Sequence, residues 1–131
     1  MNPEPDHRTI SFSIGGMVFE YDEEKNQANI KKHGISFKVA ARVFFDYNRI
    51  ELYDEENSYT EDRFDTIGSL DAGMRELSIG KIGDHTEDII FVVYTERSRI
   101  QQNDQPIEVT RLISARMATS FERGLYYGKQ E

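Results

Sequence analysis

The sequence predicts a single α+β domain, in which helices pack on one side of an antiparallel sheet. Three observations support this class. Apolar residues alternate with polar ones near the start of the chain, two helix patterns follow between residues 22 and 45, and an unbroken apolar run lies in the second half. The approximate element order is β-α-α-β-β-β-α, in which the sequence leaves room for one extra strand. A length of 131 residues fits one hydrophobic core, since two cores of half that length would each be marginal.

The first element is a strand or hairpin over residues 9–21. Ile10, Phe12 and Ile14 alternate with polar residues, and the alternation resumes at Phe19 and Tyr21. The pair of glycines between the two stretches indicates a turn or a glycine bulge.

Two helices are predicted next. Asp22 can cap the first helix, basic residues fill its last turn up to His33, and Gly34 occupies the position where a left-handed cap is common. Ser36 can cap the second helix, whose apolar face has the spacing 0, 3, 4, 7. The residues of that face are Phe37, Ala40, Ala41 and Phe44.

The rest of the chain reads mainly as strands. Residues 50–52 predict a short strand, residues 89–94 a central strand covered on both faces, and residues 109–115 the last strand, with a hairpin connection over 99–106. Thr119 and Glu122 have the spacing of a capping box that opens a terminal helix. The pattern R-x-x-x-I-G occurs at residues 63–68 and again at 75–80, which either two neighbouring strands or chance would produce.

Composition excludes several classes. The longest apolar run has six residues, so no segment is long enough to span a membrane, and the chain lacks a basic, apolar start that would direct export. Without cysteine there is no disulfide, thiolate nucleophile or thiolate metal site. A cytoplasmic protein is the expectation.

Charge is distributed unevenly along the chain. The formal net charge of −8 argues against an indiscriminate binder of polyanions. Residues 51–65 hold seven acids and one arginine, whereas residues 97–129 hold six bases, five of them arginine, and three acids. The basic third can be a salt-bridged surface or an anion site, and the acidic segment can repel nucleic acid or bind a basic partner.

This inventory suits cleavage of RNA by its own 2′-hydroxyl. The protein then needs a base, a proton donor and cations on the phosphate, and no metal. The candidate cations are Arg97, Arg99, Arg111 and Arg116, each of which can also be a surface arginine paired with an acid. On strict alternation Arg111 and Arg116 face opposite sides of a strand, unless the strand ends or bulges between them.

Two histidines have competing interpretations. His33 at a helix C-terminus can cap the helix or donate a proton. His85 lies among Asp84, Glu87 and Asp88. We interpret this stretch as a solvated loop between strands and not as a metal site, because such loops are usually polar. No metal-binding or phosphate-loop motif occurs, so we expect no metal and no cofactor.

Three motifs resemble the BrnT toxin family. The opening Met17-Val-Phe-Glu-Tyr-Asp-Glu-Glu-Lys-Asn26, followed by Lys31-Lys32-His33-Gly34-Ile35-Ser36-Phe37, is similar to M-x-F-E-W-D-x-x-K and K-H-G-[IV]-S-F of that family. Val92-Val93-Tyr94-Thr95-Glu96-Arg97 resembles its V-V-x-T-x-R strand. Ile113-Ser114-Ala115-Arg116-x-Ala118-Thr119 resembles its I-S-A-R-x-A-T ending. The resemblance places one BrnT-like domain at residues 17–131 and leaves residues 1–16 as an extra strand or a disordered leader.

The resemblance implies a RelE-like, metal-independent ribonuclease of a type II toxin–antitoxin pair. Such a bacterial toxin inhibits translation, with RNA as its substrate, on or off the ribosome. It is neutralised by a ribbon-helix-helix, BrnA-like antitoxin. We expect contact with DNA only indirectly, through this antitoxin, and no binding to a membrane. By position in the motifs, Arg97 and Arg116 are the implied functional arginines, and His33 lies in the K-H-G motif. We expect Arg97 and Arg116 to stabilise the phosphate in catalysis and either His33 or Glu96 to transfer a proton. Arg111, Lys32 and Lys25 are the expected residues that bind RNA phosphates.

A second interpretation comes from the acidity of the chain. The same fold can be a non-catalytic module that binds a ribbon-helix-helix DNA-binding partner and acts in operon regulation. The net charge of −8 and the acidic segment favour it, because both suit a basic partner.

Overall fold

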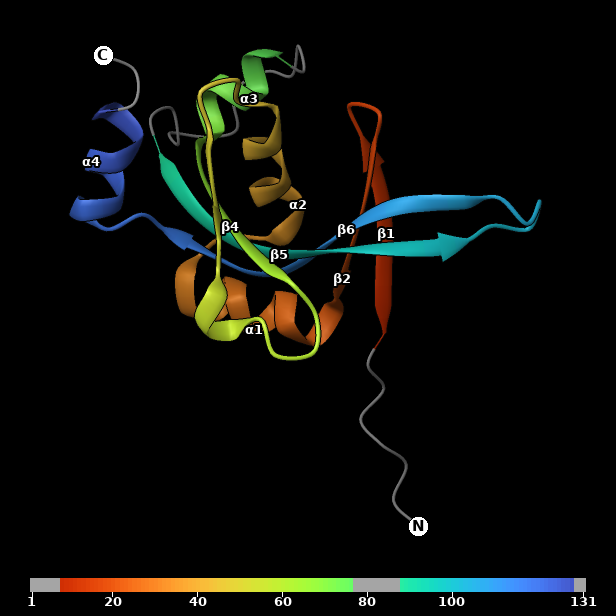
Figure 1. The fold of residues 1–131 in the computed structure, drawn as a ribbon. Coiled ribbons are helices and arrows are strands. Elements are labelled where there is room, and N and C mark those ends of the chain that lie inside the picture. Colours follow the sequence, from red (N-terminus) through yellow and green to blue (C-terminus); the bar gives the residue numbers. More distant parts are fainter. Residues whose placement is uncertain (1–7, 77–87, 129–131) are drawn as a thin grey trace.

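The structure is a computed structural model that describes residues 8–76 and 88–128 (Figure 1). It confirms the α+β class, with six strands in one sheet of order β1-β2-β6-β5-β4-β3. The strands are β1 (Thr9–Ile14), β2 (Met17–Asp22), β3 (Ile50–Tyr53), β4 (Arg63–Ser69), β5 (Ile89–Ile100) and β6 (Pro106–Met117). The helices are α1 (Glu23–His33), α2 (Phe37–Ala40), α3 (Leu70–Glu76) and α4 (Ser120–Gly128), with short 3-10 helices η1 (Ala41–Phe45) and η2 (Glu55–Asn57).

The local signals near the N-terminus give the elements they predict. β1 and β2 form an antiparallel hairpin whose turn is Gly15-Gly16, both with positive φ. The Asp22 carboxylate accepts a hydrogen bond from the Glu24 N–H at the start of α1. Gly34 ends α1 with φ 73°, a conformation that glycine adopts without steric cost.

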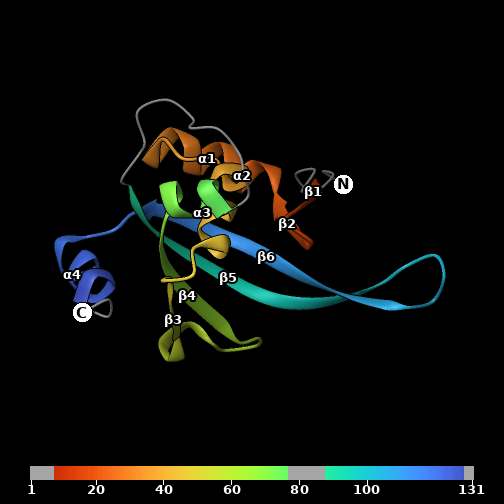
Figure 2. The ribbon, with the colours of Figure 1, turned by 90° about the horizontal axis from the view of Figure 1, so that it is seen from above.

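One face of the sheet carries the main core. Figure 2 shows α1, α2 and α3 on the same side of the sheet. The predicted apolar face of the second helix is buried there, although that helix is split between α2 and η1. The core includes Phe19, Phe37, Phe44, Val92 and Tyr94.

The structure differs from the predicted order in three ways. The sheet is mixed, because β2 pairs with β6 in parallel. An additional helix, α3, follows β4. The terminal helix α4 does not join the other helices: its Tyr126 packs with Ile67 and Ile89 in a second cluster, and the Tyr126 hydroxyl donates to the Asp46 carboxylate at 2.5 Å.

The two boundaries that the sequence left open have different outcomes. Residues 9–14 form β1, an edge strand ahead of residue 17, while the division of the chain at that residue stays a prediction. Of the two R-x-x-x-I-G segments, residues 63–68 lie in β4, paired with both β3 and β5. The second segment falls largely outside the described residues.

Candidate functional site

Five arginines share the sheet face that is turned away from α1 and α2. Residues directly opposite each other on neighbouring strands point to the same side of a sheet. By register, this face carries Arg63 of β4, Arg97 and Arg99 of β5, and Arg111 and Arg116 of β6. We call it the arginine face.

A β-bulge puts Arg111 and Arg116 on the same side. Val93 pairs with Ser114, but its neighbour Tyr94 pairs with Leu112, so Ile113 has no partner across the strand. The extra residue reverses the alternation of side chains along β6. Arg111 and Arg116 therefore face the same way, opposite Thr95 and Phe91, which resolves the question of parity that the sequence left open.

A second consequence of the register concerns spacing. Arg97 lies on β5, whereas Arg116 lies opposite Phe91 of the same strand, six residues away. At a rise of about 3.3 Å per residue, the two positions are about 20 Å apart along the sheet. One phosphate cannot contact both arginines. If the two arginines bind the same ligand, that ligand is an extended polyanion that places a different negative group at each of them.

Glutamates hold four of the five guanidinium groups. Arg97 forms two hydrogen bonds to Glu61, at 2.9 and 3.2 Å. Arg99 and Arg111 both bind Glu20, a carboxylate only 2% exposed. These arginines lower the pKa of Glu61 and of Glu20, mainly by donating hydrogen bonds to the ionised form.

The fourth pair is built around the start of α4. The Arg116 guanidinium binds both carboxylate oxygens of Glu122, at 2.7 and 2.9 Å, and lies 4.1 Å from the centroid of the Phe91 ring. Glu122 also completes the predicted capping box. Its carboxylate accepts a hydrogen bond from the Thr119 N–H, and the Thr119 hydroxyl accepts one from the Glu122 N–H. Arg116 lowers the pKa of Glu122, chiefly by donating hydrogen bonds to its carboxylate.

Asp65 is a further group on this face, and from the sequence it was only one of the seven acids of residues 51–65. It lies on β4, opposite Val93 of β5 and Leu52 of β3. Burial raises the pKa of Asp65 to about 6. The alternation Arg63, Asp65, Ile67 along one strand was a signal for its position, but nothing in the sequence indicated that its surroundings would be apolar.

The remaining sequence-predicted residues lie away from the arginine face. His33 ends α1, on the helix-covered side, and Lys25 and Lys32 are exposed on the same helix. Glu96 is exposed on β5, with the opposite parity to Arg97. The fold therefore brings Arg97, Arg111 and Arg116 onto one face and does not bring these four residues to it.

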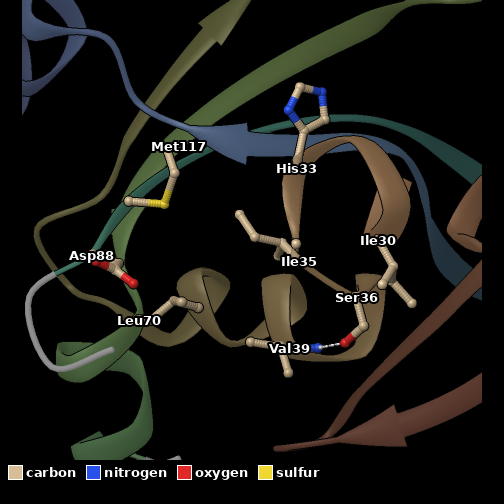
Figure 3. A pocket seen from close by; sticks show the side chains of 9 residues that line it. Ile30, His33, Ile35, Ser36, Val39, Leu70, Asp88 and Met117 are labelled. Atoms are coloured by element: carbon tan, nitrogen blue, oxygen red, sulfur yellow. Dashed lines mark hydrogen bonds between the residues drawn. The ribbon is translucent and has the colours of Figure 1, made fainter. Parts of the chain in front are cut away.

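His33 instead borders a cavity of about 570 Å³ between the end of α1, α2 and the start of α3. Its lining is mostly apolar and includes Ile35, Val39, Leu70 and Met117. Figure 3 shows the imidazole at one edge, directed away from Val39 and Leu70.

Metal binding has no support among the residues that the structure describes. Within them, no three His, Asp or Glu side chains are grouped to hold an ion. Of the cluster around His85, residues 84–87 lie outside the described residues.

No helix of the described chain is long and apolar enough to cross a membrane.

Comparison with known proteins gives one family. Residues 21–80 match the model of the family described as "Ribonuclease toxin, BrnT, of type II toxin-antitoxin system". No curated protein matches the chain. The family match confirms the resemblance drawn from the opening motif, and its range covers α1, α2 and β3 as well as Arg63 and Asp65 of β4.

Proposed function

Because residues 21–80 match the BrnT family, we propose that the chain is a toxin that cleaves RNA, inhibits translation and is neutralised by a cognate antitoxin. The family itself is that of a type II toxin–antitoxin ribonuclease. The observation that carries the proposal for this chain is the arginine face, which offers cations along an extended path. It acts in the cytoplasm, where its RNA substrate is found.

Arg116 is the proposed centre of the chemistry. A 2′-hydroxyl that attacks the adjacent phosphorus forms a pentacoordinate phosphate with extra negative charge, which a fixed guanidinium stabilises. Glu122 and the Phe91 ring hold the Arg116 guanidinium in place from two directions. Arg97 and Arg111 lie farther along the face, where they can bind neighbouring phosphates of the same strand.

The glutamate pairs set a condition for binding. An RNA phosphate must share or displace the carboxylates of Glu20, Glu61 and Glu122 to reach these arginines. This competition lowers the intrinsic affinity for free RNA. It therefore favours a substrate that is presented by a larger assembly such as the ribosome.

The roles of His33 and Glu96 in proton transfer, and of Lys25 and Lys32 in phosphate binding, remain predictions from the sequence motifs. These four residues lie on the helix-covered side of the sheet, whereas Arg116 lies on the opposite face. Their action on the same phosphate would require RNA to wrap around the sheet.

We propose a ribbon-helix-helix antitoxin as the partner. Segment 51–65 supplies a matching surface, since most of its acids are exposed and Tyr53 and Tyr59 are exposed beside them. A DNA-binding antitoxin is basic, and an acidic surface steers such a partner.

The test is cleavage of RNA by the purified chain in EDTA, next to Arg116→Ala and Arg123→Ala proteins. Arg123 is a matched control, because it is an arginine of α4 that stacks 5.9 Å from the Tyr127 ring instead of on the sheet. We expect the parent and Arg123→Ala to cleave equally, and Arg116→Ala to lose about 10²–10³-fold. Loss of the parent activity in EDTA would refute the metal-independent mechanism.

The non-catalytic module remains the second candidate, and the occupied arginines favour it. Arg97, Arg99, Arg111 and Arg116 each already bind a carboxylate. Such pairing is expected of arginines that stabilise the fold and do not bind RNA. Expression of the chain without its partner separates the two functions. A ribonuclease toxin arrests growth, and this arrest disappears with Arg116→Ala, whereas a binding module leaves growth unchanged.

A further inference from the structure

Asp65 is an acid on the arginine face for which the described residues show no hydrogen bond to arginine. The Oδ1 atom of its carboxyl is buried and forms no hydrogen bond with the described residues. The acids Glu20, Glu61 and Glu122 of the same face all bind arginine. A buried polar atom without a hydrogen bond is costly, and a catalytic role is one of the reasons for which proteins retain such an atom.

The position of Asp65 relates it to Arg116. Arg116 starts from β6, but its guanidinium lies over Phe91 of β5, the strand between β6 and β4. Asp65 lies on β4, opposite Val93, two residues along β5 from Phe91. Arg116 and Asp65 therefore lie on the same face, on either side of β5, and the two groups act on each other electrostatically.

The charges that face Asp65 come from three other elements or loops. Asp54, which follows β3, and Glu122 of α4 both disfavour its ionised form, and Arg116 of β6 favours it. Burial is the largest influence, and it also disfavours ionisation, so the pKa of Asp65 is about 6. A general base works best when its pKa is close to the pH of the reaction.

We propose that Asp65 is the general base of RNA cleavage, and that it accepts the proton of the attacking 2′-hydroxyl while Arg116 binds the phosphate. This role rests on the proposed function. The 2′-oxygen forms a bond to phosphorus, the bond from phosphorus to the 5′-oxygen breaks, and the 5′-oxygen takes a proton from water. Asp65 then releases its proton to the hydroxide that this leaves, which restores the carboxylate and the water. The products are a 2′,3′-cyclic phosphate and a free 5′-hydroxyl, so atoms and charge balance.

The experiment measures kcat/KM for cleavage of a single-stranded RNA of mixed sequence between pH 4.5 and 8.5. It compares the parent with Asp65→Asn, which keeps the shape, and with Asp65→Glu, which keeps the carboxyl. Glu56→Gln is the matched control, because it removes the same charge from an exposed position of segment 51–65. The same RNA with 2′-O-methyl groups tests the nucleophile.

For the parent, we expect activity to rise with pH, with a midpoint near 6, and then to level off. Asp65→Asn loses about 10²–10⁴-fold at pH 7.5 and loses this rise, since it cannot accept a proton. Asp65→Glu keeps the rise with reduced activity, Glu56→Gln behaves as the parent, and the methylated RNA is not cleaved.

Two results would overturn the role of Asp65 while leaving the proposed function intact. One is a parent that cleaves RNA together with an Asp65→Asn protein that cleaves within a few-fold of it. The other is an Asp65→Asn protein that is slower but keeps the same rise with pH. Failure of the parent to cleave at any pH, both alone and with ribosomes that carry a messenger RNA, would overturn the proposed function itself, and the role of Asp65 with it.

Discussion

The raised pKa of Asp65 predicts that this side chain destabilises the fold at neutral pH. Replacement of Asp65 by asparagine keeps the size of the side chain and removes its ability to ionise. We expect Asp65→Asn to be more stable than the parent near pH 8, and to lose that advantage in acid. Residues of active sites commonly carry such a cost in stability.

The sign and size follow from the surroundings of the carboxyl. The folded state binds the proton of Asp65 more tightly than the unfolded chain does, so the contribution to stability is complete below pH 3.8 and is lost as the pH rises through about 6. The difference between these two pKa values corresponds to about 3 kcal/mol. Asp65 is only half-buried, and solvent screening reduces the expected effect to about 1–2 kcal/mol.

Urea unfolding at pH 4, 5, 6, 7 and 8 measures this effect. The quantity to compare is the free energy of unfolding of Asp65→Asn minus that of the parent. We expect it to increase by about 1–2 kcal/mol between pH 4 and pH 8, with most of the change between pH 4 and pH 6, where the unfolded chain has lost the proton that the folded chain still binds. The exposed Glu56→Gln, with the same change in net charge, should follow the parent at every pH. A difference for Asp65→Asn that is constant with pH would refute the assignment of a raised pKa.

Three further predictions concern the scaffold of the site. Asn29→Ala should cost about 3 kcal/mol, because the buried Asn29 amide binds both the N–H and the carbonyl of Ala115, and urea unfolding measures the loss. Gly73→Ala should lower Tm strongly, since a Cβ there would lie 1.9 Å from the Arg42 carbonyl oxygen. Glu20→Gln should destabilise the chain at pH 7. The difference should shrink in acid, because the lowered pKa of Glu20 gives a contribution that is present above its ordinary pKa of 4.5 and is lost as the pH falls.

Each of these predictions has its own control. Gln27→Ala alters an exposed side chain of the same helix as Asn29 and should cost much less. Gly124→Ala places a Cβ in open space within α4, so it should raise Tm, by an amount that reflects about 1 kcal/mol of helix propensity. Equal losses for the two alanine-for-glycine variants would contradict the packing argument. A Glu20→Gln difference that persists at pH 3 would contradict the ion-pair argument.

Local patterns allowed most elements of the fold to be predicted. The capping residues Asp22 and Ser36, the glycine after α1 and the capping box of α4 act over a few residues, so a sequence shows them directly. The parallel pairing of β2 with β6 was not predicted, because it joins residues about 90 apart and depends on contacts that no local pattern records. The position of α4 depends likewise on the distant pair Tyr126 and Asp46.

The candidate site divides in the same way. The sequence alone determined which residue types are available: a cluster of arginines in the last third, no cysteine, and motifs that resemble the BrnT family. Tertiary structure decided which of them meet. The bulge at Ile113 turns Arg111 and Arg116 to one face, the register of β4 places Asp65 there, and His33 lies on the other side of the sheet. Side-chain direction in a sheet is set by pairing between strands, and the pKa of a carboxyl by what the folded chain packs around it, so neither is contained in the local sequence.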